Sequence, residues 1–478
     1  MKKTVLKSRL PYLLIVFGLL FTMCSVYDID LNTNMRQGMN FWRALFENNI
    51  LKYYSVNLDS FNAGEMADKA NYGMFINILN AIWVLPLYIA ERVRGGNILD
   101  LFAARIWGKI FIVLLLGLSV IYVDKLANLM KYDEKRRNYL KVLYVCSPLV
   151  IMPVCQVAQF DILGLLFCLI AIYRILKEDR KGFYVFFVLA VLSKDLPFLV
   201  LLPVLLLFEK NIFKLVGVAA SPFLIDKLMD LPFKIADPLG VYSKKSRLWM
   251  MVDFLTRSRV NLVGGVEIPI IFLAMCALCM WAYYQNTEEM DEERRKKTTI
   301  LLAAIGMLPM VLLTRANAYW CLYSVPFCLL LGMGQEKKLF IRIVLERFAA
   351  FSLTVAYMIH ATGYFSKVAG MLPELILGEK AVESYYISEM ISDFFRQEKY
   401  FNFWTLSYAV YIVWLIGFIY YELRTNTAQQ NSLEVTGQPW IDGTEKGIRL
   451  LVILAAVGGF ILCNTYVLIS LIIPFLGS

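Results

Sequence analysis

The chain has 478 residues, of which 59% are hydrophobic and 18% charged, whereas soluble domains average roughly 45–50% apolar and about 25% charged residues. This composition predicts an integral membrane protein with about a dozen apolar spans and no room for a large soluble domain. The single histidine, His360, excludes metal sites built from several histidines and disfavours a Ser-His-Asp mechanism. The net charge of +10 fits lipid headgroups or an anionic substrate. Nucleic acid is not an expected partner, because the basic residues are scattered over loops on both sides.

The first apolar run follows four basic residues and extends from Leu10 to Tyr27 without a small-residue cleavage site. It predicts a retained first helix with its N-terminus inside, followed by a first external loop, 28–102, with interfacial helices. Residues 73–91 are long enough to span, but a span there would place the basic segment 124–141 outside, against the positive-inside tendency. We therefore expect 73–91 to lie in, or re-enter, the outer interface.

The rest of the chain predicts an all-α polytopic fold, a single transmembrane domain over residues 1–478. With the first helix the expected spans number about thirteen, and the others lie near 103–123, 142–157, 160–176, 183–193, 196–208, 212–229, 262–284, 298–314, 320–334, 345–365, 403–421 and 449–473. Two of them, 183–193 and 196–208, are too short to cross about 30 Å of hydrocarbon at about 1.5 Å per residue. A broken hairpin keeps Lys194 and Asp195 away from mid-membrane, and one long helix with a paired Lys-Asp is the alternative.

Three later loops complete the predicted organisation: 230–261 and 366–402 outside, and 422–448 in the cytoplasm. The loop 230–261 is unusually basic for an external loop, and its Lys244, Lys245 and Arg247 stand beside apolar residues such as Trp249. This combination offers charge to a phosphate and an apolar face to a lipid tail. A solvated interfacial helix that holds headgroups explains the composition equally well.

Polar residues gather at the predicted external ends of the spans, where charge near a membrane indicates function. They come from five loops, although salt bridges between loops could account for any one of them. The candidate catalytic residues are Asp28 and Asp30, and the candidate substrate-binding residues, besides Lys244, Lys245 and Arg247, are Arg36, Gln159, Asp161, Lys194, Asp195, Arg315, Asn317, Tyr319 and Trp320.

These segments resemble the integral-membrane glycosyltransferases of the C superfamily (GT-C). The resemblance covers most of the first 335 residues: the acidic pair YDID, the stretch MRQGMNFWRAL, then AQFDILG, LSKDLP and NAYWCLYSVP, in this order. It implies an external acidic pair, about thirteen helices, and a flexible external loop where 230–261 falls. Ala158 stands where the family often has glycine, and the turn at Asn317 lacks a neighbouring histidine, so the donor's identity is not carried over.

Sugar transfer from a polyprenyl phosphate or pyrophosphate needs a base for the acceptor hydroxyl and positive charge for the departing phosphate. Asp28 or Asp30 can be the base, with Asp28 preferred because it directly follows the first helix. Arg36, Lys194 and Arg315 can offset the phosphate charge. Two carboxylates could also hold Mg²⁺ or Mn²⁺, although two carboxylates alone supply few of the ligands that either ion needs. Metal dependence therefore stays open.

Two other classes of protein remain as alternatives: a transporter or flippase of an anionic lipid or glycolipid, and a non-catalytic membrane assembly subunit. A transporter should show interrupted helices in two corresponding halves, and the sequence gives only one, at 183–208. The expected partners are a lipid-linked sugar donor, a glycan, lipid or protein acceptor, and the bilayer. The lack of N-x-[ST] sequons favours a bacterial cell membrane, with the active site on its external face.

Overall fold

The computed structural model describes residues 2–25, 29–46, 49–55, 72–238, 247–261, 267–313, 318–334, 339–360, 371–378, 403–428, 442–465, 467–468 and 471–472. Within them almost all regular structure is helical, which confirms the all-α prediction for this part of the chain. The exception is a short antiparallel pair, β1 (Arg259–Asn261) and β2 (Glu267–Pro269), with Val260 opposite Ile268.

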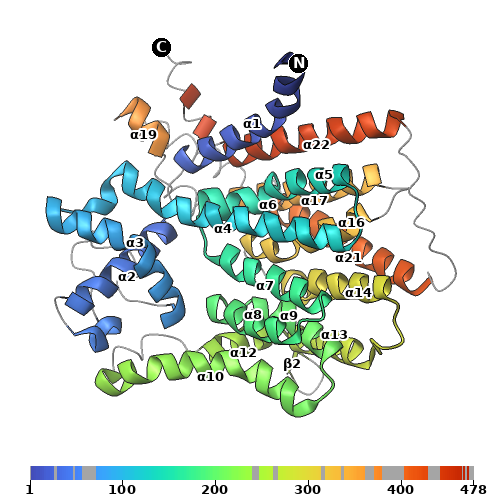
Figure 1. The fold of residues 1–478 in the computed structure, drawn as a ribbon, viewed down its shortest axis with the longest axis horizontal. Helices are drawn as coiled ribbons and strands as arrows, with labels where there is room; N and C mark the ends of the chain where they lie inside the picture. Colours follow the sequence, from blue (N-terminus) through green and yellow to red (C-terminus); the bar gives the residue numbers. More distant parts are fainter. Residues whose placement is uncertain are drawn as a thin grey trace.

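Figure 1 shows the arrangement of the helices. In chain order they are α1 (Lys2–Ser25), α2 (Ile29–Phe46), η1 (Ile50–Ser55), α3 (Met74–Arg94), η2 (Ile98–Asp100), α4 (Phe102–Leu129), α5 (Glu134–Val145), α6 (Pro148–Ile151), η3 (Met152–Gln156), α7 (Asp161–Leu176), α8 (Arg180–Ser193), α9 (Pro197–Phe208), α10 (Ile212–Ala236), α12 (Arg247–Arg257), α13 (Ile270–Tyr284), α14 (Glu292–Ile305), α15 (Leu308–Leu313), η4 (Ala318–Tyr323), α16 (Val325–Met333), α17 (Leu339–His360), α19 (Met371–Leu377), α21 (Phe403–Ala428) and α22 (Asp442–Cys463).

Four of the described helices are long and apolar enough to cross a membrane: α3, α4, and the stretches Thr405–Arg424 of α21 and Lys446–Cys463 of α22. The number rises to six if two bent pairs each form one span: Leu13–Ser25 with Asp30–Phe46, bent by 73°, and Glu134–Val145 with Pro148–Gln156, bent by 56°. Four to six such helices indicate a multi-pass membrane protein.

The expected count of about thirteen spans is wrong for the described part of the chain. Several apolar runs that were counted as spans form helices well below the length of about 20 residues that a span needs. Helix α9 has 12 residues and α13 has 15. Residues 73–91, expected at the interface, belong to the uninterrupted helix α3, which meets the length and hydropathy of a span.

The core is centred on α7, whose sequence is apolar on all sides. A helix without a polar face is stable only when it is surrounded, and α7 packs against α4, α8, α9, α14 and η4. The predicted break at Lys194-Asp195 is confirmed, because α8 ends at Ser193 and α9 begins at Pro197. The nine cysteines are all free thiols, and six of them are buried.

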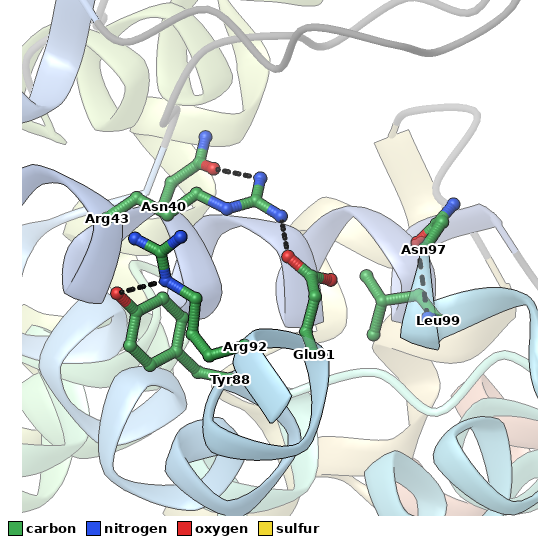
Figure 2. Close-up of polar contacts among 7 residues, drawn as sticks. All are labelled: Asn40, Arg43, Tyr88, Glu91, Arg92, Asn97 and Leu99. Carbon is green, nitrogen blue, oxygen red and sulfur yellow. Dashed lines mark hydrogen bonds and ion pairs between the residues drawn. The ribbon is translucent and has the colours of Figure 1, made fainter. Parts of the chain in front are cut away.

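Helices α2 and α3 form a parallel pair at one side of the molecule (Figure 1). The Trp42 indole donates to the Ala81 carbonyl at 2.7 Å. Earlier on both helices Gly38 lies against the backbone of Asn80, and farther along both Arg43 pairs with Glu91 while also donating to Asn40 (Figure 2). Because contacts advance in the same direction along both helices, the two N-terminal ends lie together.

Helix α3 is fixed to α4 by a reciprocal tryptophan pair. The indole N–H of Trp83 donates to the Trp107 carbonyl, and that of Trp107 donates to the Trp83 carbonyl, each at 2.9 Å. The two rings are stacked, with centroids 4.8 Å apart and planes inclined by 16°. These two hydrogen bonds, each from an indole N–H to a backbone carbonyl, fix the rotation of α3 about its own axis relative to α4.

Candidate functional site

The structure brings four of the predicted residues together at the ends of helices, and we name Asp30, Gln159, Asp161 and Lys194 the polar cluster. The Gln159 side-chain amide donates to the Asp30 carboxylate. The Lys194 ammonium lies 3.2 Å from Oδ2 of Asp161 and 5.4 Å from the centre of the Tyr72 ring. The sequence prediction that these loops converge is therefore confirmed for these four residues.

Each member of the polar cluster stands where a regular element begins or stops. Asp30 lies in the first turn of α2 and Asp161 opens α7. A carboxylate is favourable at both positions because the N-terminus of a helix has partial positive charge. Lys194 lies in the break between α8 and α9. In these places short polar side chains can meet without interrupting an apolar helix.

Gln159 is positioned by an irregular turn that follows the short π-helix η3. Ala158, just before it, has φ of 54°, in the left-handed region that glycine adopts more readily than other residues. The Gln159 N–H donates to the Pro153 carbonyl at 2.8 Å, which closes the turn. Short π-helical turns occur frequently at functional sites.

Gly164, one turn after Asp161 on the same face of α7, allows the cluster to be compact. A Cβ at Gly164 would lie 2.6 Å from the Tyr323 hydroxyl oxygen, 3.0 Å from Cγ of Pro197 and 3.5 Å from Cβ of Lys194. Tyr323 in η4 and the start of α9 can therefore approach α7 closely only because this position has no side chain.

The electrostatics of the cluster keep Lys194 charged. Lys194 lies between two helices and outside both. Burial alone would lower the pKa of its ammonium, but the carboxylate of Asp161 and the hydroxyl of Tyr72 more than offset this effect, with a smaller contribution from Asp195. Its pKa therefore lies above the ordinary lysine value. The Asp161 side chain is fully buried, so solvent does not reach the carboxylate of this ion pair.

Lys109 is a buried residue near the cluster that the sequence analysis missed. Its ammonium donates to the Met23 carbonyl at 3.0 Å and to the Cys155 carbonyl at 2.9 Å, and the residue is inaccessible to solvent. Both carbonyls lie in the last turn of a helix, α1 and η3, where backbone acceptors lack intrahelical donors. The signal was the charge of Lys109 within the otherwise apolar run WGKIFIVLLL, because a charge inside a predicted span indicates function by default.

The other predicted site residues fall into two groups. Arg36, Asp195 and Tyr319 are buried, and Trp320 packs edge-on against Tyr319 with ring centroids 6.1 Å apart. Helix η4, which carries both residues, contacts α7 and η3. The residues outside the described part of the chain are Asp28, Lys244, Lys245, Arg315 and Asn317, together with the side chain of Arg247.

Within the described residues, no group of three or more His, Cys, Asp or Glu side chains is placed to hold a metal ion. The pair suggested for Mg²⁺ or Mn²⁺ includes Asp28, which is not among them. The described cluster contains two carboxylates, an amide and one ammonium. Such a set can accept a proton, orient a hydroxyl and offset negative charge on a phosphate.

Comparison with protein-family models and with curated proteins finds no match for this chain.

Proposed function

We propose that this chain is a membrane glycosyltransferase that moves a sugar from a polyprenyl phosphate or pyrophosphate to an acceptor hydroxyl. The observation that supports the proposal most is the polar cluster, in which Asp30 and the Asp161–Lys194 ion pair lie at adjoining helix ends. The acceptor is a glycan, a lipid or a protein.

In the proposed reaction Asp30 removes the proton from the acceptor hydroxyl while the acceptor oxygen bonds to the anomeric carbon. The bond between that carbon and the phosphate oxygen breaks, and the phosphate leaves with the electron pair. Gln159 orients the Asp30 carboxylate. Lys194, with Arg36 and Arg315, offsets the charge that develops on the phosphate. Asp28 is the alternative base.

The remaining predicted residues have binding roles in this proposal. Lys244, Lys245 and Arg247 capture the lipid phosphate from an external loop, each contributing about 1 kcal/mol near an anionic surface. Tyr319 and Trp320 contact the sugar, with Asp161, Asp195 and Asn317 ordering the surrounding loops. In this proposal the site faces the exterior of a bacterial cell membrane, with residues 230–261 and 366–402 outside and 422–448 in the cytoplasm.

The test is direct assay of the purified protein in liposomes with a panel of defined polyprenyl-phosphate sugars, read by mass spectrometry. We expect transfer from at least one donor. Asp30→Asn keeps the shape of the side chain and removes its basicity, so turnover should fall by about 100- to 10,000-fold, or at least about 2.7 kcal/mol in barrier. The matched control is Glu288→Gln, an exposed carboxylate far along the chain, which should retain full turnover.

If Asp28→Asn, Asp30→Asn, Asp161→Asn and Asp195→Asn all keep wild-type turnover, base catalysis from this face is refuted. A second candidate function is a transporter of an anionic lipid. The two bent helix pairs favour it, because transporters bind substrates at interrupted helices. Movement of a fluorescent anionic lipid across the liposome, without transfer from any donor, would establish that function instead.

A further inference from the structure

Lys109 places a positive charge inside the packed part of α4, the helix that lies between α1 and α7 (Figure 1). The residue is 0% exposed, and moving an ammonium from water into an apolar interior is costly unless polar partners replace the water. The next buried positions of α4, Ile112, Leu115 and Leu116, are apolar. Apolar packing therefore holds the rest of this helix, and the charge of Lys109 needs a reason of its own.

The partners of Lys109 lie at the ends of two other segments. Its ammonium donates to the Met23 carbonyl in the last turn of α1, at 3.0 Å, and to the Cys155 carbonyl in η3, at 2.9 Å. Carbonyls at the C-terminal end of a helix have partial negative charge and lack intrahelical donors. One ammonium satisfies both, so Lys109 fixes the end of α1 and the turn η3 against the same point of α4.

Each of these two segments leads directly into the polar cluster. Asp30 follows Met23 by seven residues, and Gln159 follows Cys155 by four. The Gln159 side-chain amide donates to the Asp30 carboxylate, and we name this contact the carboxylate–amide bond. Lys109 therefore holds the chain just before both partners of that bond.

The same turn of α4, residues 108–111, also packs against the residue that follows each partner. A Cβ at Gly108 would lie 3.0 Å from Cδ1 of Leu31, the residue after the carboxylate. The ring of Phe111 lies against that of Phe160, the residue after the amide, with centroids 5.9 Å apart. One turn of α4 thus supports the carboxylate–amide bond from both sides.

We propose that Lys109 is a positioning residue that holds Asp30 and Gln159 in place for catalysis without touching the substrate. The inference deepens the proposed glycosyl transfer and rests on it for the role of Asp30 as the base. A displacement of about 1 Å in a reacting group can cost about 100-fold in rate. An uncharged side chain at position 109 would release both segments and let the carboxylate and the amide move apart.

The first experiment measures this proximity without the reaction. Asp30→Cys and Gln159→Cys are combined in a protein whose three cysteines that are not buried, Cys24, Cys276 and Cys279, are replaced by serine. A short bis-methanethiosulfonate reagent then links the two positions, and mass spectrometry follows the rate. Adding Lys109→Met should slow the cross-linking about tenfold, as the loss of one hydrogen bond predicts.

A second pair of cysteines controls for general loosening of the protein. Arg342 donates to Glu422 at 2.6 Å and joins α17 to α21. Arg342→Cys with Glu422→Cys should cross-link at the same rate with lysine or methionine at position 109. Lys109→Arg keeps the charge and the donors, so it should restore the cross-linking of the cluster pair.

The transfer assay separates positioning from binding. Lys109→Met should lower kcat by about 100-fold and leave both KM values unchanged, because the lysine contacts neither donor nor acceptor. Lys109→Arg should recover most of the lost kcat. A role in packing alone would instead lower the melting temperature and leave the kcat of the folded protein as it is.

A double-mutant cycle tests whether Lys109 acts through the carboxylate–amide bond. Gln159→Leu removes that bond. In this background Lys109→Met should cost little further kcat, because two changes that disrupt the same contact are not additive. Losses that simply add would show that the two residues act independently.

Lys210→Met is the matched control. The Lys210 ammonium also donates to carbonyls in the last turns of two helices, those of Leu206 in α9 and Tyr283 in α13. It follows the end of α9, whereas Lys194 precedes its start. The control removes the same chemistry away from the polar cluster, so it should keep the wild-type kcat and the wild-type cross-linking of the cluster pair.

The positioning role is overturned if Lys109→Met keeps the wild-type cross-linking and kcat, or if Lys210→Met loses as much kcat. Losses of Lys109→Met and Gln159→Leu that add, or a Lys109→Arg variant no better than Lys109→Met, would overturn it as well. Should Lys109→Met not fold, Lys109→Gln, whose amide donor sits one atom closer to the backbone, replaces it with the same expected results.

The outcomes also separate this proposal from the proposed function. Active transfer with unaffected Lys109 variants would refute the positioning role and leave the glycosyl transfer standing. Slower cross-linking in Lys109→Met, without transfer from any donor, would refute the glycosyl transfer and leave standing the anchoring of both segments by Lys109.

Discussion

Replacing Lys194 by methionine tests whether the ion pair with Asp161 organises the site. The two groups are 3.2 Å apart, and the Asp161 side chain is fully buried while that of Lys194 is 21% exposed. At an effective dielectric constant of about 20, Coulomb's law gives about 5 kcal/mol for unit charges at that separation. Lys194→Met leaves a buried carboxylate without its partner, so we expect the free energy of unfolding to fall by about 3–5 kcal/mol.

The measurement is reversible unfolding in mixed micelles, followed by far-ultraviolet circular dichroism. Asp161→Leu should cost a similar amount, and the double variant Lys194→Met with Asp161→Leu should recover most of the loss, because both charges are then gone. The control, Arg257→Met, breaks the ion pair with Asp253, whose side chains are 60% and 57% exposed, and should cost less than about 1 kcal/mol. The reasoning fails if Lys194→Met costs no more than this control.

Three further changes test the packing around the site. Gly164→Ala introduces a methyl group 2.6 Å from the Tyr323 hydroxyl and should lower the free energy of unfolding by about 1–3 kcal/mol, whereas Gly217→Ala, with open space at its Cβ, should raise the melting temperature. Ala158→Gly relieves a left-handed φ of 54°, so a thermal melt should show unchanged or higher stability, and a marked loss would contradict the strain. Lys109→Met leaves two buried helix-end carbonyls without a donor, and hydrogen exchange over residues 152–156 should become faster, while unchanged exchange would show that the ammonium does not stabilise that turn.

Local interruptions of helices could be predicted from the sequence. Two adjacent charges in an apolar run predicted the interruption between Ser193 and Pro197, because a charge is costly in mid-membrane. The same reasoning assembled Asp30, Gln159, Asp161 and Lys194 into one site, since each follows or precedes an apolar run. These features depend on neighbouring residues in the chain.

The number of spans could not be read in this way. An apolar helix that is surrounded by other helices, such as α7, has the same composition as a helix that faces lipid, so hydropathy counts both. Lys109 escaped attention because its partners are backbone carbonyls of segments 86 and 46 residues away. The amides of Asn34, Asn77 and Asn80 on α2 and α3 looked like parts of a solvated external loop, and only tertiary packing reveals that they are buried.

The stacked indoles of Trp83 and Trp107 give the protein an intrinsic spectroscopic probe. Two indoles stacked with centroids 4.8 Å apart lie close enough for their electronic transitions to couple. Circular dichroism would show such coupling as a paired positive and negative band. Because one ring belongs to α3 and the other to α4, the amplitude of that signal reports the separation of these helices without any attached label. The circular dichroism of the unlabelled protein would therefore follow a titration with a lipid or a sugar.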